Sequence, residues 1–102
     1  MSARYRITRS FQNHDGDPSI TLEESKLIFG AKPEFMYSPV YTVTSPTSTM
    51  SIEGDFFLWS YAGKIIPFRH YQGDLYVAVS EEAVLNKMME VASELRADIT
   101  EG

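Results

Sequence analysis

The fold is decided by residues 55 to 95, which read DFFLWSYAGKIIPFRHYQGDLYVAVSEEAVLNKMMEVASEL. Two glycine turns, Ala62-Gly63 and Gln72-Gly73, divide the first part of this stretch into three runs rich in aromatic and β-branched residues. Two-residue loops of this kind join antiparallel strands. We therefore predict a three-stranded antiparallel meander over residues 55–79.

An amphipathic helix is predicted directly after the meander, over residues 80–97. Ser80 is a good N-cap, and Glu81 and Glu82 suit the positive end of the helix dipole. The apolar residues recur at helical spacing and form one broad stripe: Val84, Leu85, Met88, Met89, Val91, Ala92 and Leu95. This stripe predicts that the helix packs on one face of the sheet.

The turn positions also fix which side chains share a sheet face. They place Trp59 opposite Ile66 and Phe57 opposite Phe68, and directly opposed side chains lie on the same face. We expect this first face to form the core, with Trp59 as its main anchor. The opposite, second face then carries Phe56, Leu58, Ile65, Pro67, Arg69, Tyr71, Tyr76 and Ala78.

The second face is too apolar to be left bare, because a solvent-facing sheet surface is normally polar. The favoured cover is the amino-terminal half, through its apolar residues Leu27, Ile28, Phe29, Phe35, Met36 and Tyr37. The alternative cover is a second subunit or a partner protein. Aromatic and arginine side chains dominate protein interfaces, so the candidate partner-binding residues are Phe56, Arg69, Tyr71 and Tyr76.

Pro67 conflicts with its position in the middle of the central strand, because proline cannot donate a ladder hydrogen bond. The sequence therefore predicts either a β-bulge at Pro67 or a shorter central strand.

The first half of the chain is less regular. Residues 1–10 alternate as an edge strand would, and residues 11–51 read as an irregular segment with one short helix and one short strand. Thr21 and Glu24 have the spacing of a capping box ahead of a helix over 22–29. The strand is predicted over 40–45, with a polar loop after it, and residues 98–102 are predicted to be a tail. Together these elements predict one α+β domain of 102 residues with an antiparallel sheet.

Composition excludes several classes of protein. The chain has no cysteine, which fits the reducing cytoplasm better than an oxidising compartment. Its amino terminus lacks the apolar core of a signal peptide, and no apolar run is long enough to span a bilayer. A net charge of −5 argues against nucleic-acid binding, which needs clustered cations.

No motif for catalysis, metal binding or cofactor binding is present. His14 and His70 lie far apart in the sequence, and the run from Asn13 to Asp17 has its glycine too early for a calcium loop. Asp55 is predicted to lie opposite His70, which is more often a stabilising cross-strand pair than a base with its orienting group. We therefore expect no catalytic residue, no metal ligand and no cofactor.

Two functions are the leading hypotheses, and nucleic-acid binding is a less favoured third. The first is a cytoplasmic, non-enzymatic protein-binding module of the inhibitor, immunity or accessory type, or a homodimer formed through the second sheet face. The alternative is a small-ligand or enzymatic pocket around His70, Asp55 and Arg69.

Overall fold

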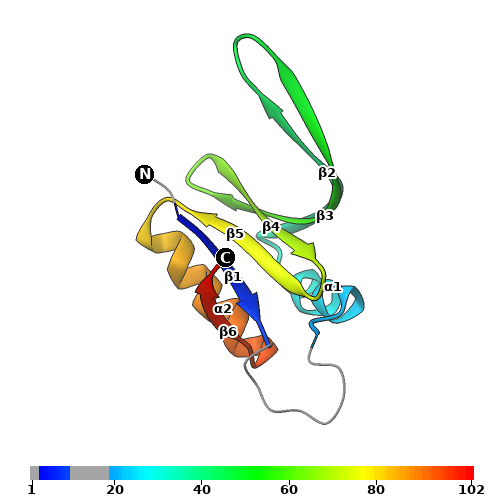
Figure 1. Cartoon of the computed structure of the whole chain (residues 1–102), viewed down its shortest axis with the longest axis vertical. Coiled ribbons are helices and arrows are strands. Elements are labelled where there is room, and N and C mark those ends of the chain that lie inside the picture. The colour runs from blue at the N-terminus through cyan, green and yellow to red at the C-terminus, as the bar shows by residue number, and fades with distance from the viewer. Residues whose placement is uncertain (1–2, 10–18) are drawn as a thin grey trace.

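The computed structural model of the chain describes residues 3–9 and 19–102. These residues form an antiparallel sheet of six strands and two helices, which confirms the predicted α+β class (Figure 1). The order of strands across the sheet is β2-β3-β4-β5-β1-β6. Along the chain the elements are β1 (Ala3–Thr8), α1 (Leu22–Gly30), β2 (Phe35–Thr44), β3 (Thr49–Tyr61), β4 (Lys64–Tyr71), β5 (Asp74–Val79), α2 (Glu82–Leu95) and β6 (Asp98–Glu101).

The two glycine turns join β3 to β4 and β4 to β5. Ala62 and Gly63 have φ values of 51° and 76°, and Gln72 and Gly73 have 48° and 81°. Two successive positive φ angles match the type I′ turn, whose twist suits a two-residue hairpin. Trp59 consequently pairs with Ile66.

Pro67 changes the central strand on one side only. The pairing of β3 with β4 runs through Leu58 and Pro67 without a shift, so no bulge forms there. The pairing of β4 with β5 begins at Arg69 opposite Tyr76 and continues only toward the turn. The ladder to β5 therefore stops short of the residue that cannot donate a hydrogen bond.

Both helices contribute to the core on the first face. The ring of Phe29 in α1 stacks on Phe57 at 4.4 Å and meets Phe68 edge-on at 6.0 Å. Helix α2 contributes Val84, Met88, Val91, Ala92 and Leu95 to the same cluster. Trp59 is buried, but it lies toward the rim, where the Lys87 ammonium sits 5.3 Å from its ring. The centre of the core is thus the phenylalanine cluster rather than Trp59.

Helix α2 is shorter than the 80–97 expected from the sequence. It begins after Glu81, which is the N-cap residue and makes no side-chain capping bond, so Ser80 does not cap it. The helix ends at Leu95, and the C-cap residue Arg96 adopts the left-handed conformation with φ 53°.

Both chain ends differ from the sequence expectation. Strand β1 is not an edge strand, because it lies between β5 and β6. Residues 98–101 are not a tail, because they form β6, which pairs with β1 from Tyr5 to Thr8. The helix-terminating turn at Arg96 reverses the chain, and this reversal lets the last residues add a strand at the edge of the sheet.

Residues 19–51 are more regular than the irregular segment predicted over 11–51. Helix α1 starts after Thr21, whose Oγ1 accepts a hydrogen bond from the Glu24 backbone N–H at 3.1 Å. Strand β2 occupies 35–44 rather than 40–45, and β3 begins at Thr49 inside the predicted polar loop. The loop predicted between Asn13 and Pro18 lies outside the described residues.

The long β2–β3 hairpin extends beyond the rest of the sheet. Its pairing shifts between Ser38 and Val40, next to Pro39, and resumes with Val40 opposite Glu53. We call residues 40–53 the arm. Figure 1 shows the arm projecting from the sheet, and the molecule measures 49 × 26 × 25 Å along its principal axes.

In the described part of the chain, the apolar residues expected to cover the second sheet face do not do so, contrary to the favoured expectation. Phe29 and Phe35 are buried in the core on the first face, and Tyr37 contacts Phe57 on that same face at 5.5 Å. Leu27 in α1 has 78 % of its surface exposed, so it is not packed on the sheet. Met36 does lie on the second face, opposite Leu58, but it is itself exposed.

A network of ion pairs links the segment between α1 and β2 to helix α2. Lys32 contacts Glu90 and Glu94, each at 2.7 Å, and Lys87 contacts Glu34 at 3.0 Å. The hydrogen bond from Lys32 holds the pKa of Glu90 below its ordinary value of 4.5. A backbone hydrogen bond, followed by the bond from Lys87, lowers the pKa of Glu34 in the same way.

These lowered pKa values predict a loss of stability in acid. A carboxyl group whose folded pKa is depressed stabilises the fold above its unfolded pKa and loses this effect as the pH falls through its folded pKa. Thermal melts should therefore show a falling Tm below about pH 4.5. Lys32→Met should make this acid-induced loss of stability smaller, because the ion pairs of Lys32 are then absent at every pH. The difference should be no more than about 1 kcal/mol, because the partner carboxylates are half-exposed. An unchanged slope in the variant would contradict the assignment.

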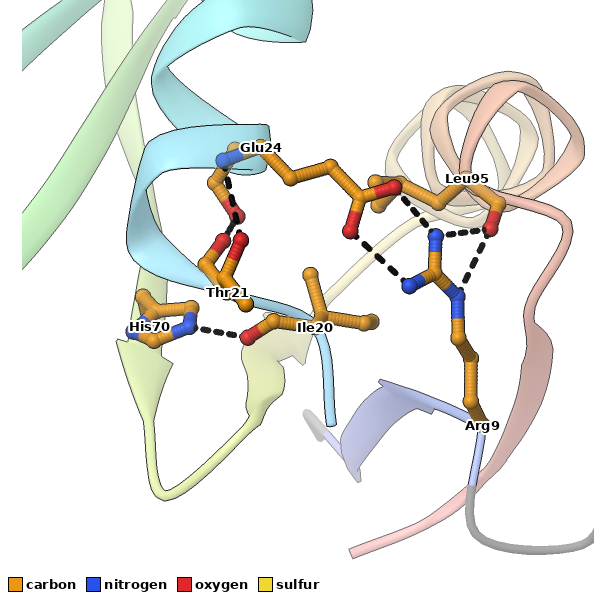
Figure 2. A network of polar contacts seen from close by, with 7 residues as sticks. Arg9, Ile20, Thr21, Glu24, His70 and Leu95 are labelled. Atoms are coloured by element: carbon orange, nitrogen blue, oxygen red, sulfur yellow. Dashed lines mark hydrogen bonds and ion pairs between the residues drawn. The ribbon is translucent and has the colours of Figure 1, made fainter. Parts of the chain in front are cut away.

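A second polar cluster joins three segments that are distant in sequence (Figure 2). The Arg9 guanidinium donates two hydrogen bonds to the carboxylate of Glu24 in α1, one of them at 2.8 Å. Its Nε donates to the backbone oxygen of Leu95, at the end of α2, at 2.9 Å. Arg9 therefore links the end of β1 to both helices.

Candidate functional site

A single row of paired residues crosses the second sheet face from edge to edge. Each neighbour in the row is a direct cross-strand partner, so all of the side chains lie on one face. The row comprises Ser38, Phe56, Arg69, Tyr76, Arg6 and Thr100. Arg69 lies between Phe56 and Tyr76, as the turn register predicts.

Arg69 is held among aromatic rings. Its guanidinium carbon lies 5.7 Å from the ring centre of Phe56 and 5.0 Å from that of Tyr71. Tyr71 meets Tyr76 edge-on at 6.3 Å. All four partner-binding candidates are thus in one contiguous cluster. Stacking on arginine keeps the aromatic rings in place and restricts the rotamers of a long side chain.

Gly54 allows this cluster to pack closely. A Cβ atom at position 54 would lie 3.2 Å from the Phe56 ring and 3.4 Å from Arg69 Nε. The first distance is tighter than an ordinary carbon contact. A methyl group at position 54 would therefore require the Phe56 ring to shift by a few tenths of an ångström, whereas its contact with Arg69 would be close to an ordinary one.

The arm forms one wall of the site. Its strand pairs Tyr41–Ile52 and Val43–Met50 carry an apolar face, whereas Thr42–Ser51 and Thr44–Thr49 carry a polar one. The Tyr41 ring lies 5.7 Å from Phe56, so the apolar face continues onto the second sheet face. This arrangement leaves Phe56 with only 3 % exposure, although neither helix covers it among the described residues.

A hollow of about 380 Å³ lies where the arm meets the sheet. Side chains from β1, β3, β4 and β5 line it. They include Arg4, Ile52, Phe56, Pro67, Arg69, Tyr71, Tyr76 and Ala78. We call the hollow, together with the apolar face of the arm, the concave surface. A hollow of this size is in the range of sites that bind a few side chains or a small molecule.

The concave surface is cationic, although the chain as a whole is acidic. Arg6 is 3.6 Å from the carboxylate of Asp74, but within the described residues neither Arg4 nor Arg69 forms an ion pair. The Nε atoms of Arg6 and Arg69 are buried and have no hydrogen-bond partner among the described residues. A buried donor without a partner costs free energy, so the close packing of these two arginines carries a penalty.

Asp55 and His70 pair across β3 and β4 but do not share a hollow with Arg69. They lie on the first face, because they continue the alternation of Phe57 and Phe68. Asp55 accepts a hydrogen bond from the hydroxyl of Tyr37 at 2.7 Å, which raises the pKa of Tyr37.

The His70 ring is also engaged by the fold. Its Nε2 donates to the backbone oxygen of Ile20 at 2.6 Å (Figure 2). A carbonyl can only accept, so this bond fixes the proton on Nε2. His70 therefore positions the segment ahead of α1. A second hollow of about 250 Å³ beside α1 is lined by neither Asp55 nor His70.

The described part of the chain offers little support for metal binding or for a membrane-spanning helix. There, no three His, Asp or Glu side chains gather closely enough to hold a metal ion. The calcium-like run from Asn13 to Asp17 falls outside the described residues. No described helix is long and apolar enough to cross a membrane. Neither a protein-family model, nor a curated protein, nor a solved structure matches this chain.

Three residues of the site were not predicted from the sequence: Arg4, Tyr41 and Ile52. Alternation in residues 3–9 puts Arg4 and Arg6 on one strand face, but it cannot show that this strand pairs with β5. The first strand of the arm was predicted over 40–45, but the residues after it read as a polar loop because serine and threonine dominate them. The alternation of Tyr41 and Val43 with threonine was the available signal of an amphipathic hairpin.

Proposed function

We propose that this chain is a protein-binding module whose contact surface is the concave surface. The observation that carries the proposal is the clustering of Phe56, Arg69, Tyr71 and Tyr76 around one hollow, on a sheet face that neither helix covers in the described structure. Aromatic and arginine side chains in a partly desolvated pocket are the usual anchors of a protein interface.

The exposed apolar residues around the hollow support a protein partner. Met36 and Ile65 on the second face, and Val43 and Met50 on the arm, all have large exposed fractions. Contiguous exposed apolar surface of this kind typically marks a protein interaction site. A two-stranded hairpin is also marginally stable alone, so an apolar arm gains most from contact with another chain.

The alternative pocket around His70, Asp55 and Arg69 has less support. Arg69 lies on the opposite sheet face from the other two residues, and both of those side chains are hydrogen-bonded to the fold. A base needs access to the proton that it would remove. The geometry therefore favours binding through the second face over catalysis between His70 and Asp55.

Tyr71→Ala tests the proposal. Tyr71 is 47 % exposed, so we expect the variant to melt within a few degrees of the parent while its complexes weaken by about tenfold or more. The complexes are those that the chain forms with itself or with proteins in an extract of its native cells. The amount and mass of each complex are measured by size-exclusion chromatography with light scattering.

The matched control is Leu27→Ala, which removes an exposed apolar side chain from α1. It should leave both the melt and the complexes unchanged. Equal complex formation by the parent and by Tyr71→Ala would overturn the proposal, and so would a loss of complexes in Leu27→Ala alone.

A further inference from the structure

The charges on the concave surface indicate the chemistry of its partner, an inference that rests on the proposed function. The chain carries a net charge of −5, yet Arg4 and Arg69 both line the hollow. The register places Asp74 and Asp98 on the same sheet face. Asp74 is paired with Arg6, and Asp98 lies in the edge strand β6 opposite Thr8. The lining of the hollow is therefore locally positive.

Arg69 is arranged to bind a carboxylate. The rings of Phe56 and Tyr71 lie within cation–π distance of its guanidinium. A guanidinium presents five N–H donors in its plane, so contacts with rings leave donors for oxygen atoms. Arg69 Nε is buried, so the donors that Arg69 can offer to a ligand in the hollow are those of its terminal nitrogens. Paired carboxylate oxygens match this donor set better than any neutral group does.

We propose that the concave surface binds an extended acidic segment of a partner protein. Carboxylate groups of that segment contact Arg69 and Arg4, and apolar side chains between them lie against Phe56, Pro67 and the arm. An extended chain turns alternate side chains to the same side. The preferred segment therefore alternates acidic and apolar residues over the length of the hollow.

The same charges argue against two other occupants. A second copy seated face to face about a two-fold axis would bring the two arginine clusters together, which is unfavourable in a desolvated interface. A nucleic acid would need cations along its whole path, whereas the surroundings of the hollow include Asp74 in a chain of net charge −5. An acidic peptide needs only the local positive charge.

The test uses isothermal titration calorimetry with unlabelled synthetic probes at low salt. The first probe is a capped eight-residue peptide that alternates Glu and Val, the second replaces each Glu with Lys, and the third is an oligothymidylate of eight nucleotides. We expect the Glu peptide to bind at least about tenfold more tightly than the Lys peptide, although the net charge of the chain favours the reverse.

Arg69→Gln should weaken binding of the Glu peptide by about tenfold or more. The matched charge-removal control is Lys64→Gln, at an exposed position on the first sheet face beside Tyr61, and it should change the affinity by less than about twofold. A thermal melt of each variant verifies that it is folded.

Several results would overturn the inference. They are equal or tighter binding of the Lys peptide, tighter binding of oligothymidylate, an unchanged affinity in Arg69→Gln, and a homodimer whose formation hides the hollow. If the acidic preference is absent while Tyr71→Ala still disrupts complexes, only the inference fails. If Tyr71→Ala leaves complexes intact, the proposed function fails as well.

Discussion

Phe29→Ala is expected to lower the free energy of unfolding by about 3–5 kcal/mol. Phe29 is the aromatic side chain that connects α1 to the sheet, and it contacts Phe35 at 4.6 Å and Phe57 at 4.4 Å. Its removal leaves a cavity that neighbouring rings cannot fill, because each of them is fixed by its own strand. Small domains have only about 5–15 kcal/mol of stability in total, so this loss would bring the chain close to unfolding.

The measurement is chemical denaturation followed by fluorescence of Trp59. The control is Leu27→Ala, which truncates a side chain on the same helix that is 78 % exposed, whereas Phe29 is buried. It should change the free energy of unfolding by less than about 0.5 kcal/mol. A stability loss below about 1 kcal/mol for Phe29→Ala would show that α1 does not close the core in the way that the structure shows.

Arg9→Ala is expected to cost about 2–3 kcal/mol of stability. The guanidinium satisfies the last carbonyl of α2 at Leu95 and pairs with Glu24 at the start of α1 (Figure 2). Removal leaves the carbonyl oxygen of Leu95 and the Glu24 carboxylate without these donors, and hydrogen bonds to charged groups are worth about 1.5–3 kcal/mol. The expected loss is smaller than for a fully buried ion pair, because about a third of the Glu24 side chain is exposed to solvent.

The control for Arg9 is Lys64→Ala, which breaks the exposed ion pair with Glu81. That pair should contribute less than about 1 kcal/mol. Denaturation of both variants at low and moderate salt separates the two cases, because screening weakens exposed pairs more than partly buried ones. Equal losses in the two variants would contradict the role of Arg9 as a link between the helices.

The fold of the carboxy-terminal half could be predicted from the sequence because its strands pair with their neighbours along the chain. The turns at Gly63 and Gly73 fix the strand pairing, and the pairing fixes the faces. This is why the α+β class and the antiparallel sheet could be predicted. It is also why Phe56, Arg69 and Tyr76 could be placed side by side before any coordinates were known.

The amino-terminal half was not accessible because its contacts are non-local. Strand β1 pairs with β5 and β6, more than sixty residues away, and alternation alone cannot choose those partners. The returning strand of the arm, from Thr49, was missed because serine and threonine in strands resemble a loop by composition. The side of the sheet that α1 covers is set by contacts of Phe29 with Phe57 and Phe68, and no local residue pattern specifies contacts at such sequence distances.

The central claim is that the concave surface is the contact surface for a protein partner. Methionine oxidation tests it most directly, because exposed methionines lie on both sides of the molecule. Met36 on the second face and Met50 on the arm are 70 % and 59 % exposed, and Met89 on α2 is 53 % exposed. Oxidation at each position is measured by mass spectrometry on the purified chain and on the chain within its native complexes. We expect complex formation to protect Met36 and Met50 while Met89 oxidises as before. Protection of Met89 with unchanged oxidation of Met36 and Met50 would contradict it.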